Sequence, residues 1–101
     1  MFVVANRIPV TEGHEEEFIE LFEERTNRLS RRAGFEKVEL LEPIDADYYI
    51  IHAYWESSDA FEQWRESEAF QEAHSDLPSE IFAGSNHIES YERAETVKNE
   101  N

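Results

Sequence analysis

Residues 48–55 read YYIIHAYW, and this stretch decides how the rest of the chain can be arranged. Tyrosine, isoleucine and tryptophan favour extended backbone, so we expect a β-strand over Tyr48–Trp55. Successive side chains of a strand point to opposite faces, and both sets are mostly apolar in this strand. Each face of the sheet therefore needs cover. Helices can cover one face, and we expect a second copy of the chain to cover the other, as in a dimeric α+β barrel.

Turn and helix signals divide the chain on either side of this strand. Apolar and β-branched segments predict strands, whereas apolar residues repeated every three or four positions predict helices. Ser57 and Ser58 offer hydroxyl groups that can cap the second helix, and Ser67 can restart it. The expected strands are Phe2–Ile8, Phe35–Leu41, Tyr48–Trp55 and Asn86–Tyr91, and the expected helices are His14–Arg32 and Ser58–His74.

The resulting order of elements is β-α-β-β-α-β. This order suits a ferredoxin-like fold of the α+β class, in which one antiparallel sheet carries both helices on the same face. We expect this domain to span residues 1–93 and a polar C-terminal tail to span residues 94–101.

Acidic residues dominate the charge of the chain. Among 101 residues there are 24 Asp and Glu but only nine Lys and Arg, and the formal net charge is −15 with neutral histidines. This charge repels phosphate groups, so we expect neither nucleic acid nor an anionic membrane as a partner. Lysine occurs only at Lys37 and Lys98. An acid-rich, lysine-poor surface stays hydrated in concentrated salt, which suggests the hypothesis of a halophilic source.

The chain contains no cysteine. Disulfides, zinc–thiolate sites, iron–sulfur clusters and thiol nucleophiles are therefore excluded. No charged-then-apolar leader opens the sequence, and no apolar run approaches the length of a membrane span. We therefore expect a cytoplasmic location.

Three polar or aromatic residues form a candidate site. Asn6 interrupts an apolar strand, so its amide either bonds to nearby backbone or faces a ligand. Trp64 follows Phe61 by three residues, as a core aromatic would, and His74 ends a helical segment, where histidine often caps the helix. Histidine is also a common ligand of haem iron. The other histidines lack the short spacing of a zinc site; they are His14, His52 and His87.

Several short motifs are specific only in combination. They are ANRI with Asn6, FEER ending at Arg25, GF at Gly34–Phe35, WES at Trp55–Ser57, AFxxW at Ala60–Trp64, and SEAFQEAH ending at His74. In these motifs the chain resembles the IsdG-type haem-degrading monooxygenases of the antibiotic biosynthesis monooxygenase-like superfamily. The resemblance covers about residues 1–93.

The resemblance implies a role for each site residue. His74 matches the proximal ligand of the haem iron, Asn6 matches a distal hydrogen-bond donor, and Trp64 matches a tryptophan that distorts the porphyrin. Arg25 would pair with a haem propionate, and Phe22 and Phe70 would line the pocket. Haem would then be both cofactor and substrate, with dioxygen and a reductase or other electron donor as the further requirements.

Three other functions remain open from the sequence. A cofactor-independent monooxygenase that oxidises quinol-like aromatics would use Asn and Trp residues on the same fold without an iron ligand. A non-enzymatic haem carrier would bind haem without degrading it. A dimeric module without a ligand is the third. The acidic segment SDLPSEIFAGSNH after His74 departs from the family's pattern, so the choice of tetrapyrrole product is not carried over.

Overall fold

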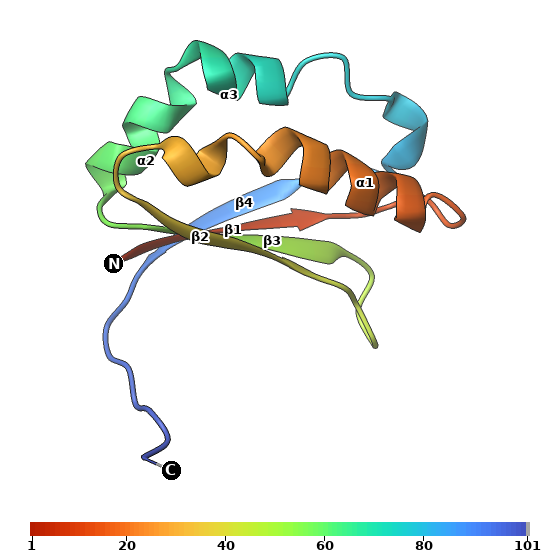
Figure 1. The fold of residues 1–101 in the computed structure, drawn as a ribbon. Helices are drawn as coiled ribbons and strands as arrows, with labels where there is room; N and C mark the ends of the chain where they lie inside the picture. Colours follow the sequence, from red (N-terminus) through yellow and green to blue (C-terminus); the bar gives the residue numbers. More distant parts are fainter. Residues whose placement is uncertain (101) are drawn as a thin grey trace.

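The computed structural model describes residues 1–100 of the chain (Figure 1). β1 (Phe2–Ile8) lies inside a four-stranded antiparallel sheet with the strand order β2-β3-β1-β4. The other strands are β2 (Phe35–Leu41), β3 (Tyr49–Trp55) and β4 (His87–Glu92). Each strand begins and ends within one residue of its predicted bounds. The predicted strand and helix order is confirmed.

The first helix is shorter than the sequence pattern predicts. The expected helix continued to Arg32, but α1 (Glu15–Thr26) ends earlier and a separate 3₁₀ turn, η1 (Leu29–Arg31), follows. The hydroxyl group of Thr26 donates to the carbonyl oxygen of Phe22 at 2.7 Å, and Thr and Asn are weak helix formers. Because the backbone then forms i to i+3 bonds, the regular α-helix stops after Thr26.

The second helical region is divided by a second cap, as the sequence indicates. α2 (Ser58–Arg65) begins after Ser57, whose hydroxyl oxygen accepts from the Ala60 amide at 3.2 Å. α3 (Glu68–Ala73) begins after Ser67, whose hydroxyl oxygen accepts from the Phe70 amide at 3.2 Å. The predicted restart at Ser67 is therefore confirmed.

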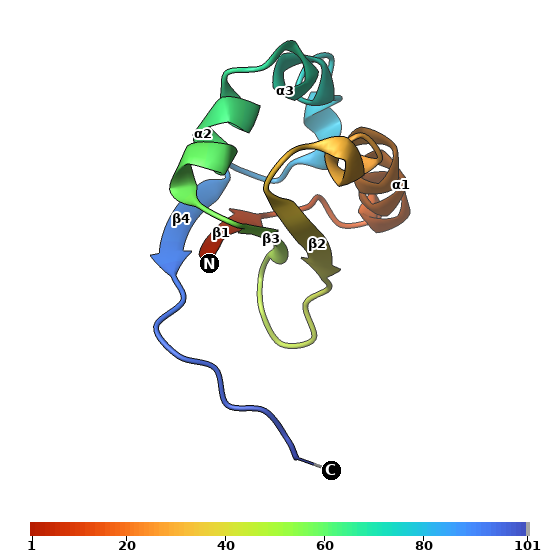
Figure 2. The same ribbon diagram turned by 60° about the vertical axis from the view of Figure 1, so that its left-hand side comes forward.

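The helices of residues 1–100 lie on one face of the sheet, while the chain after β4 runs away on the other side (Figure 2). This arrangement confirms the ferredoxin-like fold. A further 3₁₀ turn, η2 (Ser79–Ile81), leads toward β4. Ile81 of this turn is only 2% exposed because it packs with Ile8, Phe18 and Tyr49. No helix within residues 1–100 is long and apolar enough to cross a membrane.

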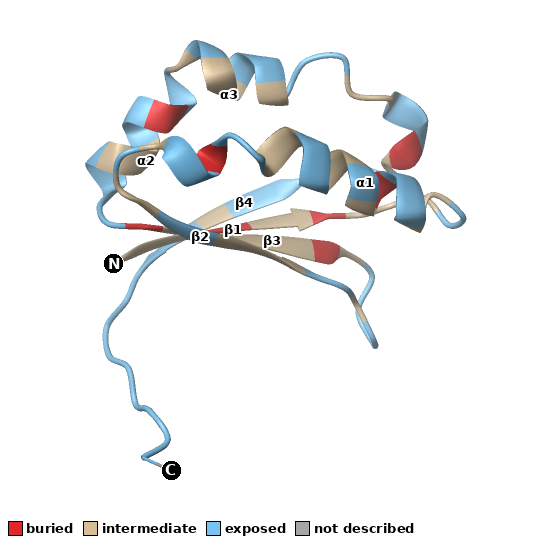
Figure 3. Ribbon diagram, in the orientation of Figure 1, coloured by how far each residue is buried: buried red, intermediate tan, exposed pale blue. Residues whose placement is uncertain are grey.

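The core lies between the sheet and the helices (Figure 3). One buried cluster contains Val4, Leu29, Trp55 and Trp64, and the other contains Ile8, Phe18, Tyr49 and Ile81. Val4 and Ile8 share one parity of β1 and Tyr49 and Trp55 share one parity of β3, so alternation along the strands sends these side chains to the helices.

The opposite parity forms the open face of the sheet, defined by Val3, Arg7, Ile50, His52 and Tyr54. These residues and the start of the C-terminal tail line a hollow of about 570 Å³. Arg7 Nε lies 3.1 Å from a Glu89 carboxylate oxygen on this face. Apolar residues therefore occupy both faces of β3, as the sequence predicts, and no helix covers the open face within residues 1–100.

Candidate functional site

His74 lies at the C-terminal cap of α3, with its ring exposed. Its backbone amide donates to the carbonyl oxygens of Phe70 and Gln71 at 3.1 and 3.2 Å. Its ring nitrogen Nδ1 lies 2.8 Å from the same Phe70 carbonyl oxygen. A carbonyl oxygen can only accept, so Nδ1 carries the proton of this bond. In the neutral ring Nε2 therefore keeps its lone pair, as a metal ligand must.

Aromatic contacts connect His74 to the core. The His74 and Phe70 ring centroids are 4.1 Å apart, and Phe70 meets Trp64 edge to face at 5.6 Å. Trp64 in turn stacks on Trp55 at 6.4 Å. The backbone bond to Nδ1 and the contact with Phe70 together fix the orientation of the imidazole ring.

Trp64 is a core residue, with 6% of its surface exposed. Its indole packs with Val4, Leu29 and Trp55, and the Arg32 guanidinium lies over the ring at 5.7 Å. The sequence left open whether Trp64 is a core aromatic residue, and its packing shows that it is. Its expected pressure on a porphyrin stays a prediction.

Asn6 lies on the helix-covered face of β1, because it shares the parity of the buried residues Val4 and Ile8. Its side chain is half-buried, and its Oδ1 accepts a hydrogen bond from Asn86 Nδ2 at 3.0 Å. Within residues 1–100 the NH2 group of Asn6 makes no hydrogen bond. Its two N–H groups can therefore donate to a molecule bound on this face.

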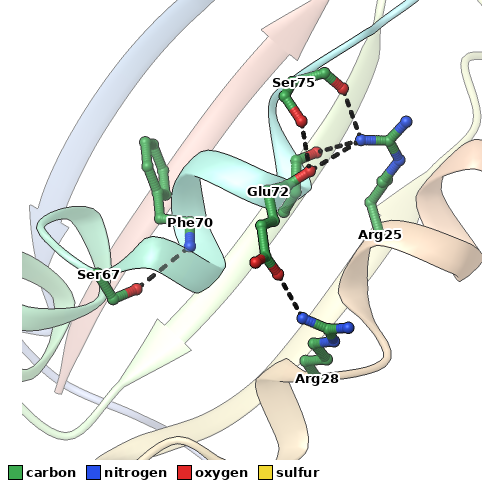
Figure 4. Close-up of polar contacts among 7 residues, drawn as sticks. Arg25, Arg28, Ser67, Phe70, Glu72 and Ser75 are labelled. Atoms are coloured by element: carbon green, nitrogen blue, oxygen red, sulfur yellow. Dashed lines mark hydrogen bonds and ion pairs between the residues drawn. The ribbon is translucent and has the colours of Figure 1, made fainter.

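Arg25 has partners other than the propionate that we expected. Its Nη1 donates to the carbonyl oxygens of Glu72 at 3.0 Å, Ala73 at 3.4 Å and Ser75 at 2.7 Å (Figure 4). These carbonyl groups belong to the end of α3 and to the residue after His74, where a helix lacks intrahelical donors. The guanidinium therefore joins α1 to the segment that carries His74. Its pairing with a propionate stays a prediction.

Arg28, which precedes η1, makes a second link to α3. Its guanidinium forms an ion pair with the carboxylate of Glu72 (Figure 4). Both side chains are largely exposed, at 70% and 61%, so solvent weakens this pair. The main connection between α1 and the end of α3 is therefore Arg25.

The expected pocket-lining residues differ in position. Phe70 lies between Trp64 and His74, as the contacts above describe. Phe22 is half-buried on α1 and belongs to neither buried cluster. The hollow on the open face includes none of Asn6, Trp64 or His74. The candidate site therefore lies on the opposite side of the sheet from that hollow.

The donor set of the site fits haem. His74 offers one imidazole nitrogen, and the porphyrin nitrogens already ligate haem iron, so one histidine suffices as the protein ligand. Phe70 supplies an apolar surface beside the imidazole, as haem pockets require.

Comparison with known proteins identifies the family. The family model described as antibiotic biosynthesis monooxygenase matches residues 1–76. The chain belongs to this family. A staphylobilin-producing haem oxygenase of Staphylococcus saprophyticus is 38% identical over 77 residues, which cover 73% of this chain and 73% of that protein. The IsdG-type resemblance predicted from the sequence motifs is therefore confirmed.

Solved structures of the family share the fold. The structure of the haem degrader MhuD from Mycobacterium tuberculosis with two haems bound is 26% identical, with a TM-score of 0.80, over 97% of this chain and 100% of that chain. SnoaB, a cofactor-independent oxygenase from Streptomyces nogalater, is 23% identical, with a TM-score of 0.82, over 97% of both chains. At this lower identity the likeness shows the fold alone.

Asn86 contacts the candidate site through Asn6, but it was not among the site residues predicted from the sequence. It was expected to begin the last strand, but that strand begins at His87. Its contact with Asn6 spans 80 residues of sequence and depends on the register in which β4 pairs with β1. An Asn that precedes a weak strand does not specify the register of that strand against β1. No signal in the sequence could therefore have identified this contact.

Proposed function

We propose that this protein is a haem-degrading monooxygenase that binds haem through His74 and opens the porphyrin ring with dioxygen and supplied electrons, releasing iron. The observation that carries the proposal is the Nδ1 bond of His74, which leaves Nε2 as the free ligand atom. The 38% identity with a staphylobilin-producing haem oxygenase supports the same conclusion.

The side chains of the site would divide the work. When bound, haem supplies the iron that activates dioxygen and the ring that is oxidised. Nε2 of His74 would hold the iron, and the backbone bond at Nδ1 would keep the imidazole in the required tautomer. The NH2 group of Asn6 would donate a hydrogen bond on the helix-covered face. Trp64 and Phe70 would exclude water with apolar rings.

A hemin titration tests the iron ligand. We expect the Soret band to shift when hemin binds the wild-type protein, and we expect His74→Ala to weaken binding by about tenfold or more, which is roughly 1.4 kcal/mol. His87→Ala is the matched control, because His87 is an exposed histidine at the start of β4. Equal affinities of the two variants would reject His74 as the ligand.

Reductive turnover separates an enzyme from a carrier. With ascorbate and oxygen, we expect the Soret absorbance of the loaded wild-type protein to decay while free iron appears in a chelator assay. A stable spectrum would support a haem carrier. If hemin produced no Soret shift at all, a cofactor-independent oxygenase or a module without a ligand would be the better conclusion.

A second copy of the chain is the proposed cover of the open face, giving the dimeric barrel. Val3, Ile50 and Tyr54 supply its apolar surface. We expect a dimer by light scattering, and we expect Ile50→Glu to yield monomers because it places a charge in the buried interface. Ile88→Glu is the control: Ile88 pairs opposite Asn6 on the other face of the sheet and is 56% exposed. A dimeric Ile50→Glu variant would contradict this assignment.

The remaining partners follow from the reaction. Ring oxidation consumes electrons, so a reductase or another electron donor must deliver them. A cytoplasmic location would give access to such donors, and the cysteine-free sequence is compatible with reducing conditions.

A further inference from the structure

The contact between Asn86 and Asn6 has a chemical consequence for the proposed site. A side-chain amide presents an acceptor oxygen on one side and two N–H donors on the other. Rotation of the terminal amide by half a turn exchanges them. Whichever end of the Asn6 amide Asn86 engages, the opposite end stays free. Because Nδ2 of Asn86 donates to Oδ1 of Asn6 at 3.0 Å, the donor end of Asn6 is left for a ligand.

The backbone holds Asn86 where this contact requires it. On its N-terminal side the Ala83 amide donates to the Pro9 carbonyl oxygen at 3.0 Å. On its C-terminal side His87 pairs with Arg7 in the sheet. Asn86 and Ile88 share one parity of the chain, and Ile88 pairs opposite Asn6. Asn86 therefore lies diagonally across from Asn6 on the helix-covered face, within reach of a side-chain bond.

We infer that Asn86 is a positioning residue that orients the Asn6 amide so that its N–H groups, and not its oxygen, face the bound haem. This inference rests on the proposed function. Asn86 itself does not touch the reacting atoms in this scheme. Its effect would be exerted through Asn6, whose N–H groups would donate to the ligand.

The substitution Asn86→Asp tests the orientation with almost no change in shape. A carboxylate can only accept, so Asn6 must turn its NH2 group toward Asp and present its oxygen to the ligand. Asn27→Asp is the matched control for the added negative charge, because Asn27 is an exposed residue at the end of α1. Asn6→Ala gives the result expected for complete loss of the donor.

The first measurement uses the haem-free protein. In side-chain amide NMR spectra, we expect a shifted, slowly exchanging Asn86 NH2 proton in the wild type and ordinary solvent-exposed Asn6 NH2 signals. In Asn86→Asp we expect the hydrogen-bonded signal to move to Asn6. A wild-type spectrum with the hydrogen-bonded proton on Asn6, or on neither residue, would overturn the inference. This result does not depend on haem, so it is separate from a failure of the proposed function.

The second measurement uses the haem-loaded protein with carbon monoxide as the probe. A hydrogen-bond donor lowers the C–O stretching frequency, whereas an acceptor oxygen raises it. We expect Asn86→Asp to raise this frequency at least as far as Asn6→Ala, and to slow turnover by about tenfold with hemin affinity unchanged. Asn27→Asp should match the wild type. A wild-type frequency and rate in Asn86→Asp would show that Asn86 has no positioning role.

Discussion

Trp64 is a core residue, and the proposed function gives it a second role, pressure on the porphyrin. Its indole is buried against Trp55 and Phe70, so Trp64→Ala should cost about 3–5 kcal/mol, a large part of the roughly 5–15 kcal/mol that stabilises a domain. Trp64→Phe keeps an apolar ring and is the better test. We expect it to retain hemin binding and to slow turnover, because a smaller ring presses less on the porphyrin.

A matched substitution separates the two roles of Trp64. Trp55 is 1% exposed and lies in the same cluster, so Trp55→Phe makes the same chemical change there. We expect both variants to lose stability in urea unfolding, and only Trp64→Phe to lose activity after correction for the folded fraction. If Trp64→Phe and Trp55→Phe lost activity equally, Trp64 would have only a structural role in the core.

Tyr49 makes stability depend on alkaline pH. Burial, followed by the hydrogen bond and negative charge of Glu42, raises the pKa of its phenol above the ordinary value. As pH rises, the unfolded state therefore loses the phenol proton before the folded state does. The contribution of Tyr49 to the free energy of unfolding is complete below the pKa of the unfolded state, and it is lost as pH rises toward the pKa of the folded state. Over that interval the free energy of unfolding should fall as pH rises, because the folded state binds more protons than the unfolded state.

Tyr49→Phe should remove this alkaline loss. It also removes the hydrogen bond from the Tyr49 hydroxyl to Glu42, at 3.2 Å, which lowers stability at neutral pH by about 0.5–1.5 kcal/mol. Urea unfolding between about pH 8 and pH 11 measures both effects. Tyr91→Phe, at an exposed position on β4, is the control. An unchanged alkaline slope in Tyr49→Phe would exclude Tyr49 as its source.

At the scale of elements, α3 depends on α1 for its C-terminal end. α3 spans only Glu68–Ala73, and Arg25 supplies donors to the carbonyl groups that follow its last turn. We expect Arg25→Gln to speed amide hydrogen exchange over residues 72–78 by about tenfold, since a charged hydrogen bond contributes roughly 1.5–3 kcal/mol. Hemin affinity should fall with it, because His74 lies in this segment.

Arg28→Gln is the control for Arg25→Gln. It removes a positive charge just after α1, before η1, and breaks only an exposed ion pair with Glu72, which contributes about 0–1 kcal/mol. We expect little change in exchange or hemin affinity. The same exchange rates in the two variants would show that charge, and not the bonds to the carbonyl groups, links α1 to α3.

The strands were predictable because alternation and turn residues are local signals, so β1 and β2 agree with the sequence at both ends. The break after Thr26 was not predictable, since Phe18, Phe22 and Leu29 continue one helical period across it. The serine caps at Ser57 and Ser67 were predictable from side-chain chemistry.

The candidate site also has features that were predictable from the sequence and features that were not. His74 could be placed at a helix end, but the partners of Arg25 and Asn6 are 47 to 50 and 80 residues away in sequence. Such contacts depend on how α3 docks on α1 and on the register of β4 against β1. Neither is encoded in a local pattern, which explains why the sequence gave no sign of the carbonyl partners of Arg25 and no role to Asn86.

At the scale of the whole molecule, the net charge of −15 opposes folding. Only nine basic residues are available, and several acids lie together on α1 at Glu15, Glu16 and Glu17. Salt screens repulsion between exposed charges over a Debye length of about 10 Å at 0.1 M. We expect added potassium chloride to stabilise the protein, and a gain of about 1 kcal/mol would raise Tm by roughly 4–8 °C.

Calorimetry in potassium chloride and in sucrose separates screening from general exclusion of a cosolute. Sucrose stabilises folded proteins without screening charge, so it should give a gain that does not depend on net charge. Replacing Glu16 and Glu23, two exposed acids of α1, by Gln lowers the repulsion. We expect this double variant to gain less from potassium chloride than the wild type and the same from sucrose. A Tm that stays flat or falls in strong salt would contradict both charge repulsion as the destabilising force and adaptation to a halophilic source.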